Sequence, residues 1–332
     1  MNLFWSTRAL TDAREDHLTE FFASALEISE EFRTAYYDFV VASHAEKNGW
    51  GAIGIESVQT QVAFKDTTCC PDMILNLSNG KRIACEHKLD ALETLGPERD
   101  PRWQLQRYLD LPIDGLVYTR SSWKPPGADI LANPKYIHPT EREHFLWRDF
   151  YPLFNSDHIL IAWLREGFER LGFTPPHPSI GEMSGPDEVT NRLNRENFAK
   201  LWGRTRSFAH TIGWKVGTGA IVELYLTENP NSLASSIFIS PTKAERFLFR
   251  VTPQKNKSTQ VEKVLRASTL SVAGKVEIRS REVARKEGKE LVVDLTTSLR
   301  EILGVKFLSP EEIENKLLLF VQPLLLAVDR QG

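Results

Sequence analysis

The sequence predicts an α/β domain with a mixed sheet, followed by a second domain of α+β type. Two observations support this prediction. Helical and strand patterns alternate over the first half of the chain. A segment rich in proline and glycine, TPPHPSIGEMSGPDEVT, then interrupts both patterns. We therefore expect one domain over residues 1–173, a linker over 174–190 and a second domain over 191–332.

In the first half, apolar residues at helical spacing predict helices, and alternation of apolar and polar residues predicts strands. Two apolar runs separated by Ser-Asn-Gly indicate a hairpin. The expected elements are, in order, one or two helices within Ala13–Val41, a strand at Ile53–Phe64, a hairpin over Pro71–Leu89, a helix at Pro101–Leu111, a strand at Gly115–Arg120, and helices at Glu141–Phe154 and Ile159–Leu171.

The second half contains five short apolar runs that are typical of strands: GAIVELYLT, SSIFIS, RFLFRV, KVEIRS and ELVVDL. An apolar helix is expected to close the chain. Ser309 is suited to cap this helix, and Pro310 is suited to its first turn. The sequence of this half does not indicate a fold type more specific than α+β.

Composition excludes several classes of protein. Hydrophobic residues make up 41% of the chain and charged residues 26%, which excludes a disordered chain. The three cysteines lack the paired spacing of a structural zinc site and are too few for a disulfide scaffold. The apolar run Leu317–Val328 is interrupted by Gln322 and Pro323 and falls short of the ~20 residues that span a bilayer. We expect a soluble, cytoplasmic protein without a membrane partner.

The net charge of −3 conceals two segments of opposite charge. Residues 1–60 hold ten acids and four bases, and residues 243–289 hold thirteen bases and five acids. This division suits a protein that binds cations at one site and phosphates at another. The alternative interpretation is that both charged segments are simply solvated surfaces. The basic residues proposed for phosphate contact are Lys255, Lys257, Lys263, Arg266, Arg279, Arg281, Arg285 and Lys286.

The turn of the hairpin decides which side chains face each other. A two-residue turn would set Asp72 opposite His87, whereas a three-residue turn with a left-handed Gly80 sets Asp72 opposite Glu86. The three-residue turn keeps one face of the hairpin apolar, so we predict this register. The apolar face then carries Met73, Leu75, Leu77, Ile83 and Cys85, and the other face carries Asp72, Asn76, Arg82, Glu86 and Lys88.

Two facing carboxylates indicate a cation site. Their Cβ atoms would lie only ~4.5–5.5 Å apart, and like charges this close repel unless a cation sits between them. Carboxylate oxygens suit Mg²⁺ or Mn²⁺ better than zinc. Lys88 lies on the same face, where it can orient and help deprotonate a metal-bound water or offset charge that develops on a phosphate. The set predicts metal-dependent hydrolysis of a phosphodiester.

The motif P-D…E-x-K on a hairpin, preceded by a helix and a strand, resembles the PD-(D/E)xK nuclease superfamily, which has the restriction-endonuclease-like fold. The resemblance covers Ala13–Arg120, about a third of the chain. It implies that Asp72 and Glu86 bind the metal and that Lys88 assists the attacking water. It also implies that the backbone carbonyl of His87 completes the coordination.

The same resemblance assigns residues outside the hairpin. The first helix of this family commonly supplies a further metal-binding glutamate, which Glu20 matches, and His17 is a weaker candidate ligand. Exonuclease-like members carry Q-x-x-x-Y on the helix after the lysine, which Gln104 and Tyr108 match on one helix face. Together with Arg107, these two residues are expected to contact substrate. The implied fold is a restriction-endonuclease-like mixed sheet flanked by helices.

We therefore expect an Mg²⁺- or Mn²⁺-dependent deoxyribonuclease, of the kind found in prokaryotic restriction or antiphage defence. The family resemblance implies 5′-phosphate and 3′-hydroxyl products. The C-terminal half would bind substrate, a protein partner or a second copy of the chain. Trp103, Trp123 and Lys124 flank the site, either as base-stacking and phosphate contacts or as core aromatics and surface charge. The alternatives are a catalytically silent nucleic-acid-binding or assembly protein with the same fold, and an RNA-directed nuclease.

Overall fold

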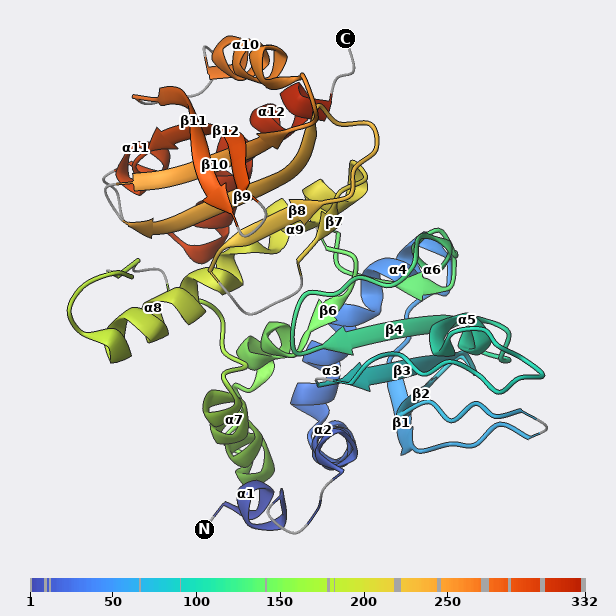
Figure 1. Cartoon of the computed structure of the whole chain (residues 1–332). Coiled ribbons are helices and arrows are strands. Elements are labelled where there is room, and N and C mark those ends of the chain that lie inside the picture. Colours follow the sequence, from blue (N-terminus) through green and yellow to red (C-terminus); the bar gives the residue numbers. More distant parts are fainter. Residues whose placement is uncertain are drawn as a thin grey trace. The chain divides into compact units, whose positions relative to one another are not determined.

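The computed structural model describes the whole chain except residues 1, 9–10, 12, 66, 90, 141, 178–179, 182, 218–221, 244–245, 270–274, 286–287, 305–307 and 330–332, and the side chains of 242, 243, 285 and 288. Lys286, proposed above for phosphate contact, lies outside the described residues. The chain divides into two compact units, Met1–Pro175 and Pro176–Gly332 (Figure 1). The division falls inside the proline-rich segment 174–190.

The first unit is a mixed α/β structure. Its strand order is β1-β2-β3-β4-β5, and β6 also pairs with β4. The neighbours β1, β2 and β3 are antiparallel, whereas β4 runs parallel to β3, β5 and β6. Its strands are β1 Ile55–Thr60, β2 Met73–Leu77, β3 Arg82–Lys88, β4 Gly115–Arg120, β5 Tyr136–Ile137 and β6 Phe145–Leu146. Its helices are α1 Leu3–Arg8, α2 Arg14–Ile28, α3 Glu30–Val40, α4 Ala42–Lys47, α5 Gln104–Leu109, α6 Ala128–Leu131, the 3₁₀ helix η1 Trp147–Leu153 and α7 Ile159–Leu171.

Helices cover both faces of this sheet (Figure 1). The helices α2, α3 and α7 pack on the face that presents Met73, Leu75 and Cys85. On the other face, α5 and α6 cover Ile74 and Ala84, which are fully buried. The face that carries Asp72 and Glu86 is therefore partly a second core, rather than the wholly polar face that the sequence suggested.

The hairpin between β2 and β3 has the predicted three-residue turn. Gly80 adopts φ +80°, and the Leu77 amide donates to the Lys81 carbonyl at 2.8 Å. A positive φ of this size favours glycine because it has no Cβ. The paired residues of the two strands follow the same register. Asp72, one residue before β2, therefore stands opposite Glu86 in β3, which confirms the predicted register.

One predicted element is wrong in type. Residues 142–154 were expected to be helical, but the chain forms the short strand β6 and then the 3₁₀ helix η1. Pro152 lies inside η1 and cannot donate the backbone hydrogen bond that an α-helix requires. The large apolar residues of this segment are nevertheless in the core, since Trp147 and Phe150 are fully buried. The expected helices at 13–41, 101–111 and 159–171 and the expected strand at 115–120 are confirmed.

The second unit is built on one antiparallel sheet of order β11-β12-β10-β9-β8-β7. Phe247, Phe249 and Val251 alternate inward along β10, and Phe247 contacts Phe320 of α12. Ser309 caps α12 as expected, because its hydroxyl accepts from the Glu312 amide at 3.2 Å. The strands are β7 Lys215–Val216, β8 Leu224–Thr227, β9 Ala234–Lys243, β10 Arg246–Pro253, β11 Glu277–Arg285 and β12 Gly288–Thr297; the helices are α8 Glu188–Ala199, η2 Lys200–Trp202, α9 Gly203–Thr211, α10 Ser258–Ser268, α11 Leu299–Leu303 and α12 Pro310–Asp329.

Within the described residues, no helix is both long enough and apolar enough to cross a bilayer. The longest helix, α12, has 20 residues and contains Pro323. Its apolar side packs within the second unit, where Leu317, Val321 and Leu324 are fully buried. The hydrophobicity of α12 is thus explained by the core of the second unit.

Candidate active site

The two carboxylates of the hairpin lie in the interior of the first unit. Asp72 is 7% exposed and Glu86 is fully buried. The Asp72 carboxylate is fixed because its Oδ2 accepts from the His87 backbone amide at 2.7 Å. The hairpin register alone brings these two acids together, since thirteen residues separate them in the sequence.

Glu86 has fewer partners than a buried carboxylate normally has. Both of its oxygens are buried, and its charged partner is the Lys88 ammonium, whose Nζ lies 2.5 Å from Oε1. Burial and the neighbouring Asp72 raise the pKa of Glu86 to about 8, and burial raises the pKa of Asp72 to about 6. A proton on one of the two carboxylates, or a cation between them, would therefore relieve their repulsion.

Lys88 is held between two glutamates. Its ammonium lies 3.0 Å from Glu15 Oε1 and 2.5 Å from Glu86 Oε1. The second oxygen of Glu15 accepts from the Leu89 amide at 2.7 Å. Burial alone would lower the pKa of Lys88, but Glu86 and Asp72 together outweigh burial and raise it. Lys88 is consequently a fixed, protonated ammonium.

The predicted Gln-Tyr pair on α5 lies beside this cluster. Gln104 Nε2 donates to the Tyr108 hydroxyl at 2.8 Å, and that hydroxyl donates to the Cys70 carbonyl at 2.9 Å. Burial and the Glu86 charge raise the pKa of Tyr108, so its hydroxyl keeps its proton. The hydroxyl directs its single proton to the Cys70 carbonyl. The pair fixes the loop that leads into Asp72.

Three residues assigned from the sequence occupy other positions. Glu20 is exposed on α2, and Glu15 is the acid of that helix that reaches the cluster. Arg107 was expected to contact substrate, but it is 6% exposed and donates to Thr68 Oγ1 at 2.8 Å. His17 packs against two phenylalanine rings rather than near the carboxylates. Metal binding by Glu20 stays a prediction, and helix–sheet packing brings Glu15 rather than Glu20 to the Lys88 ammonium.

The His87 ring lies on the opposite face of the sheet from the carboxylates. Its Nδ1 is 2.9 Å from the Thr19 hydroxyl, and the ring centroid lies 4.7 Å from that of Trp147. Burial, followed by the charge of Lys88, lowers the pKa of His87 to about 3. This neutral core ring does not serve the site. Coordination by the His87 backbone carbonyl stays a prediction.

Two further charged residues escaped sequence reasoning. Arg120 pairs in register with Lys88 on the adjacent parallel strand β4, and its Nη2 donates to the Ala91 carbonyl at 2.9 Å. Glu93, partly buried, accepts from the Leu105 amide at 3.0 Å and lies within electrostatic range of Arg120 and Lys88. Only the alignment of β3 with β4 brings these groups together. No motif in the sequence could have shown it.

The flanking tryptophans differ in exposure. Trp103 is 49% exposed, whereas Trp123 is 3% exposed. Trp103 is therefore accessible enough to stack on a base, whereas Trp123 is a core aromatic and is not. Lys124 is partly buried, and burial followed by the charge of Arg120 lowers its pKa.

The donor set fits a hard divalent cation. Glu86 offers two buried oxygens, one of them 2.5 Å from Lys88 Nζ, opposite the buried carboxylate of Asp72. The described part of the chain contains no group of three or more His, Cys, Asp or Glu side chains able to hold a metal. Mg²⁺ typically keeps several waters and takes one or two protein carboxylates, whereas zinc requires three or four protein ligands. Two carboxylates therefore fit Mg²⁺ or Mn²⁺ and do not fit zinc.

Comparison with known proteins yields little. No family model matches the chain, and no curated protein matches it. Among solved structures, the crystal structure of YbjN from E. coli is similar at a TM-score of 0.23 and 13% sequence identity, over 38% of this chain and 86% of that one. A similarity this low carries no argument about fold or function. The function must be argued from the site itself.

Proposed function

We propose that the protein is a metal-dependent deoxyribonuclease whose first unit is a restriction-endonuclease-like domain. The order of elements supports the fold assignment, since α2 and α3 precede β1, the hairpin of β2 and β3 follows, and α5 and β4 come next. This is the context in which the PD-(D/E)xK resemblance expects its acids and lysine.

One observation carries the proposal. The Glu86 carboxylate is fully buried, stands opposite Asp72 and has the Lys88 ammonium, 2.5 Å away, as its charged partner. A purely structural role would leave two crowded carboxylates with one ammonium partner, which destabilises the fold at neutral pH. Such a cost is typical of groups that are retained for binding and catalysis.

Each residue of the cluster has a distinct part in the proposed reaction. Asp72 and Glu86 would hold Mg²⁺ or Mn²⁺, which when bound supplies Lewis-acid polarisation of a phosphodiester. Lys88 is already protonated, so it acts by electrostatic stabilisation of charge on the phosphate rather than as a general base. Glu15 fixes the direction of the Lys88 side chain, and Tyr108 fixes the loop before Asp72.

The substrate assignment extends the resemblance. DNA is the proposed substrate, and cleavage of matched DNA and RNA strands separates it from the RNA-directed alternative, because no feature of the sequence reads a 2′-hydroxyl. The proposed products carry a 5′-phosphate and a 3′-hydroxyl, and the proposed setting is the cytoplasm of a prokaryote that restricts foreign DNA. The second candidate is a silent nucleic-acid-binding protein with the same fold. Arg107 is buried, and its position favours neither the nuclease nor the silent binding protein.

The test is cleavage of circular and linear DNA, single- and double-stranded, in Mg²⁺, Mn²⁺ or EDTA. The parent protein is compared with Asp72→Asn and Glu86→Gln, and Glu56→Gln, an exposed glutamate on β1, serves as a matched control. We expect metal-dependent cutting that both site variants lose and the control keeps. Cutting that persists in EDTA, or in Asp72→Asn, would refute the proposed site. Binding of Mn²⁺ and DNA without cutting would support the silent protein instead.

A further inference from the structure

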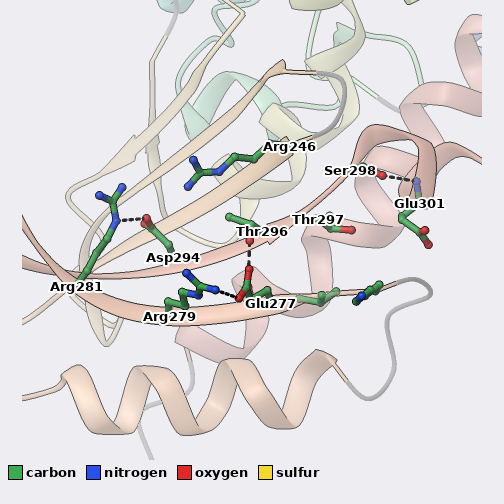
Figure 2. Close-up of a pocket in the computed structure, with 11 residues that line it drawn as sticks. Arg246, Glu277, Arg279, Arg281, Asp294, Thr296, Thr297, Ser298 and Glu301 are labelled. Atoms are coloured by element: carbon green, nitrogen blue, oxygen red, sulfur yellow. Dashed lines mark hydrogen bonds and ion pairs between the residues drawn. The ribbon is translucent and has the colours of Figure 1, made fainter.

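The second unit contains a groove of 920 Å³ at one end of its sheet, formed by β10, β11, β12 and the segment that leads into α11 (Figure 2). Four cationic side chains line it: Arg246, Lys275, Arg279 and Arg281. Arg246 and Lys275 are exposed, and neither forms an ion pair with any acid that the structure describes. Arg279 extends from β11 and pairs with Glu277. The groove is thus rich in exposed donors.

A buried carboxylate organises the basic side of this groove. Asp294 is 3% exposed and accepts from Arg250 Nε at 2.6 Å, from Arg250 Nη2 at 2.9 Å and from Arg281 Nε at 2.8 Å. These hydrogen bonds outweigh burial and lower the pKa of Asp294, so it stays ionised. One carboxylate therefore serves two guanidiniums and leaves a surplus positive charge. It also fixes Arg281, half of whose side chain is exposed (Figure 2).

We propose that this groove binds the phosphate backbone of DNA. Phosphate contacts by lysine, arginine and hydroxyl groups supply most of the affinity of proteins that hold DNA without reading its sequence. An extended groove with several separated cations suits successive phosphates of a polymer better than a single small anion. The choice of DNA as the polymer rests on the proposed nuclease function. The groove itself lies wholly in the second unit and involves no residue of the carboxylate site.

The test measures DNA binding without cleavage. Full-length Asp72→Asn protein in EDTA is titrated into fluorescein-labelled single- and double-stranded DNA, and anisotropy is followed over a range of NaCl concentrations. The groove variant adds Arg246→Gln, Lys275→Gln and Arg279→Gln to this background. The matched control instead adds Arg192→Gln, Lys215→Gln and Lys289→Gln, three exposed basic residues of the same unit outside the groove.

We expect the groove variant to raise Kd at least tenfold and to reduce the slope of log K against log[NaCl] by about 0.9 for each lost phosphate contact. The control should keep both values near those of its parent. An unchanged Kd and slope in the groove variant, or an equal loss in the control, would overturn the inference. Circular dichroism confirms that the groove variant is folded.

The experiment separates this inference from the proposed function. Parent protein that cleaves DNA, with a groove variant that binds as tightly as its parent, would refute the groove alone. Groove-dependent DNA binding by a parent that fails to cleave in any metal would refute the nuclease and support the groove. Groove-dependent binding of RNA with no binding of matched DNA would overturn the assignment of the ligand.

Discussion

Replacing Glu86 with glutamine removes a charge that burial makes costly, and the effect must depend on pH. In the folded protein the pKa of Glu86 is about 8, against 4.5 for an ordinary glutamate. The folded state thus holds a proton that the unfolded state releases above pH 4.5. Stability is greatest at low pH and falls as the pH rises from about 4.5 to about 8, where the folded protein also loses the proton.

The magnitude follows from this difference. Each pKa unit corresponds to 1.36 kcal/mol, so the Glu86 charge lowers the free energy of unfolding by roughly 3 kcal/mol between pH 5 and pH 8 in the absence of metal. Glu86→Gln cannot ionise and escapes this loss. Relative to the parent, the variant should therefore gain up to ~3 kcal/mol on going from pH 5 to pH 8.

The assay is urea unfolding in EDTA at pH 5 and pH 8, followed by tryptophan fluorescence. Glu56→Gln, an exposed glutamate on β1, is the matched control and should show the same small effect at both values. A stability difference between Glu86→Gln and the parent that is equal at pH 5 and pH 8 would refute the reasoning. In that case Glu86 would not be the group that takes up the proton.

Three further predictions follow from the contacts of the site. Glu15→Gln should slow metal-dependent DNA cleavage at least tenfold, because the charge and hydrogen bonds of Glu15 hold the Lys88 side chain in place. An unchanged kcat would refute this positioning role of Glu15. Tyr108→Phe loses the bond to the Cys70 carbonyl and should lower the unfolding free energy by ~1 kcal/mol, measured by urea unfolding, and a neutral effect would contradict that bond. Ser309→Ala removes the cap of α12 and should cost ~1 kcal/mol in the same assay without altering cleavage, whereas altered cleavage would contradict the assignment of catalysis to the first unit.

The hairpin could be predicted in full because a local rule decides it. Ser-Asn-Gly between two apolar runs leaves two turns, and only the turn with a left-handed Gly80 keeps Met73, Leu75 and Cys85 on one face. The confirmed register then places Asp72 against Glu86 without further information. Burial of one face was enough to choose between the two turns.

The ring of charges around the hairpin could not be predicted in the same way. Glu15 reaches Lys88 because α2 packs on the sheet with its first turn over the end of β3, a tertiary arrangement that helical periodicity does not encode. Arg120 lies beside Lys88 because β3 and β4 pair in parallel. The register of these two strands depends on the crossover through α5. Glu20 was chosen from the family resemblance, and the helical pattern gives no sign that Glu15 is the acid that contacts Lys88.

The second unit shows a different limit. Its strands are visible in the sequence as apolar runs, and alternation in β10 matches its buried Phe247 and Phe249. The strand order, with β12 between β10 and β11, joins Arg250 and Arg281 to Asp294. This strand order arranges part of the basic segment 243–289 as the lining of a groove. A count of charges along the sequence does not predict that groove.

The most direct test of the carboxylate site uses Lys88→Met. The substitution keeps Asp72 and Glu86, so Mn²⁺ binding measured by calorimetry should persist. The variant lacks the ammonium, so cleavage of supercoiled DNA in the same Mn²⁺ buffer should fall by at least a hundredfold. Retained metal binding with lost cleavage is the result that we predict. Cleavage by Lys88→Met at the rate of the parent would contradict the central claim that these three residues form the catalytic site.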